Sequence, residues 1–153
     1  MSSVVLAGLH LVANSQDQVA CLRREAQAII IKEALEAELK AKAGKLIILG
    51  DMNDMDNAVQ PAYKVQSRSR ALSILKSTGN VSLINAASKI TAETDRYSVE
   101  WKPAGRAIER SLIDHILLSP DWRIASVEAD HTDPITGPLR PSDHWPLKAT
   151  LNL

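Results

Sequence analysis

Two aliphatic segments near the amino terminus flank a long stretch that contains neither glycine nor proline. The first segment, Val4–Val12, is rich in β-branched and aliphatic residues and predicts a strand. The stretch from Gln16 to about Lys42 consists mainly of alanine, leucine, glutamate, lysine and arginine, which predicts a long helix ending at Gly44. The second segment, Lys45–Gly50, is continuously aliphatic, as in strands buried on both faces of a parallel sheet. The three segments together predict a βαβ unit.

The apolar residues of the expected helix lie on more than one side of it. With 3.6 residues per turn they form two seams along the helix. The first seam consists of Ala28, Ile31, Leu35 and Leu39, and the second of Leu22, Ala26, Ile29 and Ile30. A helix with so wide an apolar surface is expected to pack against a large neighbour.

The remainder of the chain predicts a loop, a short helix and five more strands. Residues Asp51–Ser67 are rich in polar residues without periodicity, as in a loop, and a short helix is expected from about Arg68 to Ser77. The last strand begins at Leu147 and alternates between aliphatic and polar positions, which is the pattern of a half-buried strand. The other four strands are expected at Val81–Ile84, Arg96–Trp101, Leu112–Leu118 and Ile124–Ala129.

These elements predict an α/β protein, more closely an α+β sandwich, in which a mixed sheet carries helices on one face. Two helices are too few to cover both faces of a sheet with so many strands. An apolar face should therefore remain, which a second sheet or a partner would bury.

Composition limits the class of protein. The chain has 153 residues, 45% of them hydrophobic, so residues 1–153 are expected to form a single domain. Basic and acidic residues number 18 each, so net charge gives no general attraction to nucleic acid or acidic membranes. The lone cysteine, Cys21, cannot form an internal disulfide and is expected to be a small buried hydrophobe. The sequence shows neither a secretory signal nor an apolar run of the roughly 20 residues that span a membrane, which predicts a soluble chain in an undetermined compartment.

Polar residues interrupt or end several of the expected strands. Asp51 and Asn53, in the sequence GDMND, directly follow a buried strand, where a sheet edge can present polar groups to a ligand. Asp114 interrupts the aliphatic sequence LIDHILL, and an ionisable group there needs a partner, for which a histidine is expected. Taken alone, GDMND could equally be a turn, because aspartate and asparagine favour turns.

Two further segments contain histidines. Asp143 and His144, in the sequence SDHWP, suit a metal ligand beside a proton acceptor, although this segment too could be a turn. His10 interrupts the first strand, and a lone histidine there is more often a core residue with satisfied hydrogen bonds than a catalyst. His115 would point to the face opposite Asp114 and is interpreted as structural, and His131 as a surface loop residue.

In this order, the sequences HL, GDMND, IDHILLS and SDHWPL resemble the ordered motifs of the endonuclease/exonuclease/phosphatase superfamily. The resemblance extends from about Val4 to Leu151, and the helix segment Arg23-Arg24-Glu25-Ala26-Gln27 before GDMND strengthens it. It implies the carboxy-terminal half of a four-layer fold. The amino-terminal half, which supplies an asparagine and a metal-binding glutamate in that family, is absent from this sequence, and the more usual Asn-Thr before His-Leu is Gly8-Leu9 here.

The resemblance also implies roles at the phosphate. Asp51 and Asn53 would orient the attacking water and the scissile phosphate, and Asp51 could also accept a proton. His10 would contact the phosphate or protonate the leaving oxygen. These roles suit phosphodiester hydrolysis, which needs an in-line nucleophile and positioned proton carriers.

At the metal and the water, Asp143 and His144 carry the implied roles. Asp143, together with His144, would bind a divalent cation, Mg²⁺ or Mn²⁺. His144 would activate the water or stabilise the developing charge, and Asp114 would hold His144 in orientation. Asp114 and His144 begin their strands whereas His10 and Asp51 end theirs, so the four meet at one sheet edge if the two pairs of strands run antiparallel.

Three functions remain open at this level. The first is a metal-dependent phosphodiesterase, for preference a nuclease, and the second is a catalytically silent half-domain that binds a partner, a copy of itself or a separate amino-terminal half. The third is hydrolysis of inositol phosphates or sphingolipid headgroups. Arginines could contact any phosphate-rich substrate, although most surface arginines are only solvated charge: Arg23, Arg24, Arg68, Arg70, Arg106, Arg110 and Arg140.

Overall fold

The computed structural model describes residues 3–14, 17–42, 44–59, 67–102, 104–132 and 142–152. Gln16, Arg140 and Leu153, which belong to features expected from the sequence, lie outside these ranges. Within the described residues, no helix is both long and apolar enough to cross a membrane.

A four-stranded sheet with the strand order β1-β2-β6-β3 forms the centre of the fold. Strands β1 (Ser3–His10) and β2 (Gly44–Asp51) are parallel neighbours joined by helix α1 (Gln18–Lys42), so the expected βαβ unit is present. Strand β6 (Asp114–Leu118) runs antiparallel to β2, and β3 (Ile84–Asn85) runs antiparallel to β6. The sheet is therefore mixed, as the sequence predicted.

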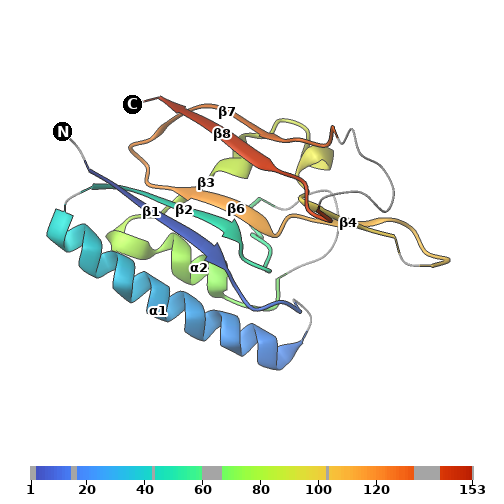
Figure 1. Ribbon diagram of the computed structural model, residues 1–153, viewed down its shortest axis with the longest axis horizontal. Coiled ribbons are helices and arrows are strands. Elements are labelled where there is room, and N and C mark those ends of the chain that lie inside the picture. Colours follow the sequence, from blue (N-terminus) through green and yellow to red (C-terminus); the bar gives the residue numbers. More distant parts are fainter. Residues whose placement is uncertain are drawn as a thin grey trace.

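Helices α1 and α2 (Ala71–Lys76) lie on one face of this sheet (Figure 1). The first apolar seam of α1 faces the sheet, where Ala28 and Leu35 are buried against Leu46 and Ile48 of β2. Cys21 is buried as expected.

Helix α1 packs against a large neighbour, the sheet, as expected, but its second apolar seam is exposed. Ile30 is 67% exposed, and Leu22, Ala26 and Ile29 also lie at the surface. A helix lying on a sheet buries one stripe along its length, and these residues lie outside that stripe.

Strands β7 (Arg123–Ala129) and β8 (Leu147–Asn152) pair antiparallel and lie over the opposite face of the four-stranded sheet (Figure 1). Ile47, Ile116 and Leu118 of the central sheet pack in one cluster with apolar residues of this hairpin. The chain itself thus covers part of the face that was expected to be bare.

The rest of that face remains open. Leu6 pairs with Ile47 and Leu49 pairs with Ile116, so all four side chains point to the same side of the sheet. Val4, Leu6 and Leu49, here called the open face, are 48%, 65% and 37% exposed.

Strands β3, β4 and β6 are shorter than predicted, and the strands after residue 80 are divided among three sheets. Strand β4 (Val99–Trp101) pairs with β5 (Glu109–Ser111) in a separate hairpin, and β5 was not predicted. The sequence Glu-Arg-Ser has no alternating apolar pattern, so only its pairing with β4 makes it a strand. Three 3₁₀ turns occupy other parts of this region, at Thr78–Asn80, Ala86–Lys89 and Glu93–Asp95.

Candidate active site

Polar residues from three strands form a row at one end of the central sheet. β1 ends at His10, β2 ends at Asp51, and β6 begins at Asp114. Because β6 is antiparallel to β2, the strand register places His10 opposite Asp51 and Asp51 opposite Asp114. Directly paired residues point to the same side of a sheet, so the three side chains share one face. This is the face that includes the open face.

His144 reaches the row from the segment that precedes β8. Its Nδ1 atom lies 2.7 Å from Asp114 Oδ2, and its Nε2 atom lies 4.0 Å from Asp51 Oδ2. A single β-bridge pairs His144 with Val99, and the His144 amide donates to Ser142 Oγ at 3.0 Å. The contact between Asp114 and His144 that the sequence led us to expect is therefore present.

A tight turn after β2 holds Asp51 in place. The backbone amide of Asn53 donates to Asp51 Oδ1 at 2.8 Å, and its side-chain amide donates to Asp51 Oδ2 at 3.1 Å and to the Leu11 carbonyl at 3.0 Å. Asn53 has a φ of 47°, a left-handed conformation that asparagine tolerates better than most residues. Gly50 has a φ of 129°, and a Cβ atom there would lie 2.1 Å from the Leu9 carbonyl oxygen, so the turn requires glycine.

His10 is an exposed residue of the site. Its side chain is 77% exposed, and Nε2 lies 3.5 Å from Asp51 Oδ2. This exposure excludes the alternative that His10 is a core histidine.

The charges of the site change two pKa values. Burial, together with the nearby charge of Asp114, raises the pKa of Asp51 despite the amide of Asn53 and the two histidines. Burial alone would lower the pKa of His144, but its hydrogen bond with Asp114 and the charges of Asp114, Asp51 and Asp143 raise it. The site thus concentrates negative charge, which favours a bound proton or cation.

Three residues of the site could hold a metal ion. One ligand atom each from Asp51, Asp114 and His144 lie within 4.8 Å of one another. Two carboxylates with one imidazole suit Mg²⁺ or Mn²⁺. Asp143 is exposed and stands outside this group, so its role as a ligand stays a prediction. Asp114 was expected only to orient His144, because a residue inside an aliphatic strand gives no sequence signal for metal binding.

Residues in the first half of α1 bond the segment that follows His10, a supporting role that the sequence analysis did not identify. Arg24 is fully buried and donates to the Val12 carbonyl at 3.1 Å, and Gln27 accepts the Val12 amide at 3.1 Å. They fix the segment that follows His10. The sequence had left open that Arg24 contacts a phosphate, but its buried position and these bonds give it a structural role instead. Glu25 binds the guanidinium of Arg70 at 3.1 Å.

His115 lies in the core behind the site. Its Nδ1 atom is 2.9 Å from the amide nitrogen of Asn85, and its Nε2 atom is 2.8 Å from the Asp54 carbonyl. The Asn85 amide also donates to Asp56 Oδ2 at 3.0 Å. His115 therefore accepts at Nδ1 and donates at Nε2, and burial lowers its pKa. These contacts agree with a structural role.

His131 is not a free surface residue, contrary to expectation. Its ring is partly buried and stacks on Tyr97 with centroids 3.8 Å apart. Trp145 meets the His131 ring edge-on at 5.6 Å. These contacts join segments far apart in the sequence, so the local polar composition around His131 did not reveal them.

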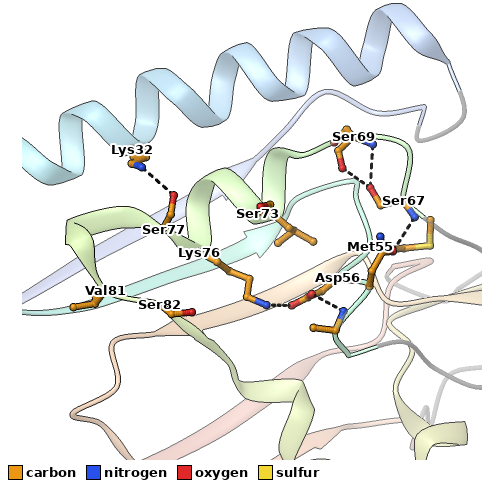
Figure 2. A pocket seen from close by; sticks show the side chains of 13 residues that line it. Lys32, Met55, Asp56, Ser67, Ser69, Ser73, Lys76, Ser77, Val81 and Ser82 are labelled. Carbon is orange, nitrogen blue, oxygen red and sulfur yellow. Dashed lines mark hydrogen bonds and ion pairs between the residues drawn. The ribbon is translucent and has the colours of Figure 1, made fainter.

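Two pockets differ in their relation to this chemistry. A pocket of about 340 Å³ is lined by Asp114 and His144 together with Leu49, Ile116 and Trp145. A larger pocket of about 680 Å³ lies beside α1 and α2, and none of the site residues line it (Figure 2). The smaller pocket is the candidate site, because the paired Asp114 and His144 line it.

The side chains of the larger pocket are joined by polar contacts. Lys76 forms an ion pair with Asp56 at 2.9 Å, and Lys32 donates to Ser77 Oγ at 2.9 Å (Figure 2). Asp56 also accepts the amide of Asn85, so this pocket is linked through Asn85 to His115 behind the site.

Comparison with known proteins gives one family. The sequence model described as "Endonuclease/Exonuclease/phosphatase family" matches residues 3–144. A comparison with the sequences of curated proteins finds no match.

Solved structures share the fold at low sequence identity. A 3'-5' exonuclease (NExo) of Neisseria meningitidis is 22% identical with a TM-score of 0.72, covering 97% of this chain and 61% of its own. Truncated TDP2 of Caenorhabditis elegans is 16% identical with a TM-score of 0.65, covering 98% and 55%. A mannosyl-6-phosphatase of Bacteroides thetaiotaomicron is 19% identical with a TM-score of 0.63, covering 97% and 51%. The chain thus spans between half and two thirds of the length of these three structures.

Proposed function

The chain belongs to the endonuclease/exonuclease/phosphatase family, and we propose that it supplies the carboxy-terminal half of a metal-dependent phosphodiester hydrolase that uses an activated water. The observation that carries this proposal is the group formed by Asp51, Asp114 and His144, in which two carboxylates surround a histidine of raised pKa.

A divalent cation, Mg²⁺ or Mn²⁺, held by the carboxylates of Asp51 and Asp114 and by Asp143, would neutralise negative charge that grows on the phosphate. In the proposed reaction His144 takes a proton from the attacking water at Nε2. Asp114 bonds Nδ1 at 2.7 Å and stabilises the imidazolium that forms.

The other site residues bind and orient. Asn53 holds both oxygens of Asp51 and so fixes the direction of that carboxylate. His10, largely exposed beside Asp51, is positioned to contact a phosphate oxygen or to protonate the leaving oxygen. In this proposal Asp51 orients the water and the phosphate.

Nucleic acid is the substrate class that we prefer. Two structures of NExo from Neisseria support this preference, because they share the fold. One is described as a 3'-5' exonuclease, and the other as a 3' phosphatase bound to a product DNA hairpin. Hydrolysis of other phosphate esters, such as inositol phosphates or sphingolipid headgroups, uses the same groups, and a mannosyl-6-phosphatase also shares the fold.

A second candidate is a catalytically silent module that pairs with a separate amino-terminal half or with a copy of itself. The open face favours it, because Val4, Leu6 and Leu49 expose apolar surface beside the site. The two candidates are compatible where the covering partner completes the site.

Hydrolysis of a labelled DNA oligonucleotide tests the enzyme proposal, with the chain assayed alone and with the partner that covers the open face. We expect cleavage with Mg²⁺ or Mn²⁺, none in a chelator, and loss of most turnover in His144→Ala. Full activity in the chelator, or an unimpaired His144→Ala variant, would falsify the mechanism. Metal binding without hydrolysis in both preparations would support the silent module.

A further inference from the structure

Ser98, a fully buried residue directly before β4, is bonded to two of the segments that carry the site. Its hydroxyl oxygen accepts the backbone amides of Ile113 and Asp114, each at 3.1 Å. Its carbonyl accepts the amide of Trp145 at 2.7 Å. A hydroxyl oxygen has two lone pairs, so one serine satisfies both amides at the start of β6.

These bonds lie on either side of the contact between Asp114 and His144. Ser98 holds the backbone of Asp114 through its hydroxyl and the residue after His144 through its carbonyl. The next residue along the chain, Val99, forms the β-bridge with His144. The distance from the Asp114 carboxylate to the His144 ring therefore depends on where Ser98 places the two backbones.

The same serine is linked through Ile113 to the turn that holds Asp51. The Ile113 carbonyl accepts the amide of Met52 at 2.9 Å, while the Ile113 amide donates to Ser98 Oγ. Ser98 is thus joined directly to the start of β6 and to the residue after His144, and through Ile113 to the turn after β2.

We propose that Ser98 is a positioning residue whose hydroxyl sets the geometry of the Asp114 and His144 pair. Its effect on catalysis rests on the proposed hydrolase function, whereas its effect on the pair does not. Ser98 itself does not contact substrate in this proposal.

Ser119 provides a matched control. It is also buried, and its hydroxyl oxygen accepts the Leu46 amide at 3.1 Å. That bond lies just beyond the last residue of β6, whereas the site lies at the first. Ser119→Ala therefore removes the same type of hydrogen bond without touching the Asp114 and His144 pair.

The first measurement needs no activity. The nitrogen-15 shifts of the His144 ring report which ring nitrogen carries the proton, and a carboxylate at Nδ1 favours the proton there. At one fixed pH, we expect Ser98→Ala to change these shifts, Ser98→Thr to restore them because it keeps the oxygen, and Ser119→Ala to leave them as in the wild type. Unchanged shifts in a folded Ser98→Ala protein would overturn the proposal, as would equal changes in Ser119→Ala.

The second measurement separates binding from turnover in the preparation that hydrolyses DNA. A displaced pair should lower kcat by about 10-fold to 100-fold with KM within about twofold, because misplacement of a catalytic group affects the reaction step. Ser98→Thr should recover kcat, and a loss confined to KM would count against positioning. If the ring shifts change as expected but the wild type hydrolyses nothing, the proposed function fails while the positioning of the pair stands.

Discussion

In the proposed mechanism Asp114 has two roles through one carboxylate. It accepts the hydrogen bond of His144 Nδ1 at 2.7 Å, and it belongs to the group that could hold a metal ion. The negative charge is needed for both, because an imidazolium and a divalent cation are each stabilised by a neighbouring carboxylate.

Replacing that carboxylate with an amide should therefore cause a large loss of activity. We expect Asp114→Asn to lower kcat by about 100-fold or more, because a neutral side chain stabilises neither the protonated ring nor the cation. Steady-state kinetics of the active preparation measures this, and Asp121→Asn, at an exposed position near β7, should behave as the wild type. Near-normal turnover in Asp114→Asn would show that the pair is not part of the reaction.

Arg24 illustrates a residue whose importance depends on burial. Its guanidinium is fully buried and bonds the carbonyls of Val12 and Ala13 and the sulfur of Cys21. Lysine cannot reproduce this planar set of donors.

We expect Arg24→Lys to lower the free energy of unfolding by about 1–3 kcal/mol, since buried acceptors lose their partners. Urea unfolding provides the measurement. The neighbouring Arg23 is exposed, and Arg23→Lys should change stability by less than about 0.5 kcal/mol. Equal effects at both positions would contradict the structural role given to Arg24.

At the scale of elements, the loop after β2 is joined to α2 by the ion pair between Asp56 and Lys76 (Figure 2). Burial opposes ionisation of Asp56, but hydrogen bonds from Lys76, Asn85 and the Ala58 amide outweigh it, and the pKa of Asp56 is lowered. A carboxyl whose pKa is lower in the folded state adds stability at pH values above its unfolded pKa. That contribution is lost as the pH falls through the folded pKa.

Asp56→Asn should remove this contribution. We expect the variant to be less stable than the wild type by about 1–3 kcal/mol near neutral pH, with a difference that narrows below about pH 4, the usual range of an aspartate. Urea unfolding at several pH values gives the difference directly. If the difference in the free energy of unfolding between variant and wild type stayed constant into the acid range, Asp56 would not be the titrating group.

The elements that the sequence predicted well are those with strong local patterns. Helix α1 lacks glycine and proline throughout, and β1 and β2 are aliphatic runs, so their bounds agree with the structure to within about two residues. Strand β5 was missed because Glu109-Arg110-Ser111 is polar and depends on pairing with β4. The sequence did not show which seam of α1 packs on the sheet, because an isoleucine such as Ile30 gives the same pattern whether it is covered or exposed.

The site, too, contains residues that the sequence predicted and residues that it did not. His10, Asp51, Asn53, Asp114 and His144 were selected from the order of short motifs, and the structure brings them together at one end of the sheet. Ser98 gave no signal, because its hydrogen bonds to Ile113, Asp114 and Trp145 join residues at least 15 positions apart in the sequence. Such a residue can be recognised only from the folded chain.

At the scale of the whole molecule, the two faces of the central sheet differ in how completely they are covered. Helices cover one face, and the β7–β8 hairpin lies over the other (Figure 1). The hairpin packs on Ile47 and Ile116, whereas Val4, Leu6 and Leu49 stay exposed. Burying one aliphatic side chain fully is worth about 1.5–3 kcal/mol, so three half-exposed ones favour association.

We therefore expect the isolated chain to self-associate through the open face or to be marginally stable. Sedimentation over a range of concentrations tests the first outcome, and Leu6→Glu should shift the chain towards monomer by placing a charge in the contact. Ile30→Glu is the matched control, since Ile30 is equally exposed but lies on the outer side of α1. A monomer with a sharp thermal transition would show that the open face needs no cover, and dissociation by Ile30→Glu alone would move the interface to the helix.

The position of Leu49 has a thermodynamic consequence. This side chain belongs to the open face, and it also lines the pocket that contains Asp114 and His144. In the proposed function, a molecule seated on the open face would therefore form part of the wall around a bound phosphate. The two equilibria are then linked. If assembly raises the affinity for phosphate by some factor, bound phosphate must raise the association constant of the assembly by the same factor. Measuring the dissociation constant of the assembly with and without inorganic phosphate and Mn²⁺ would give that factor, and the specific activity would rise with protein concentration until assembly is complete.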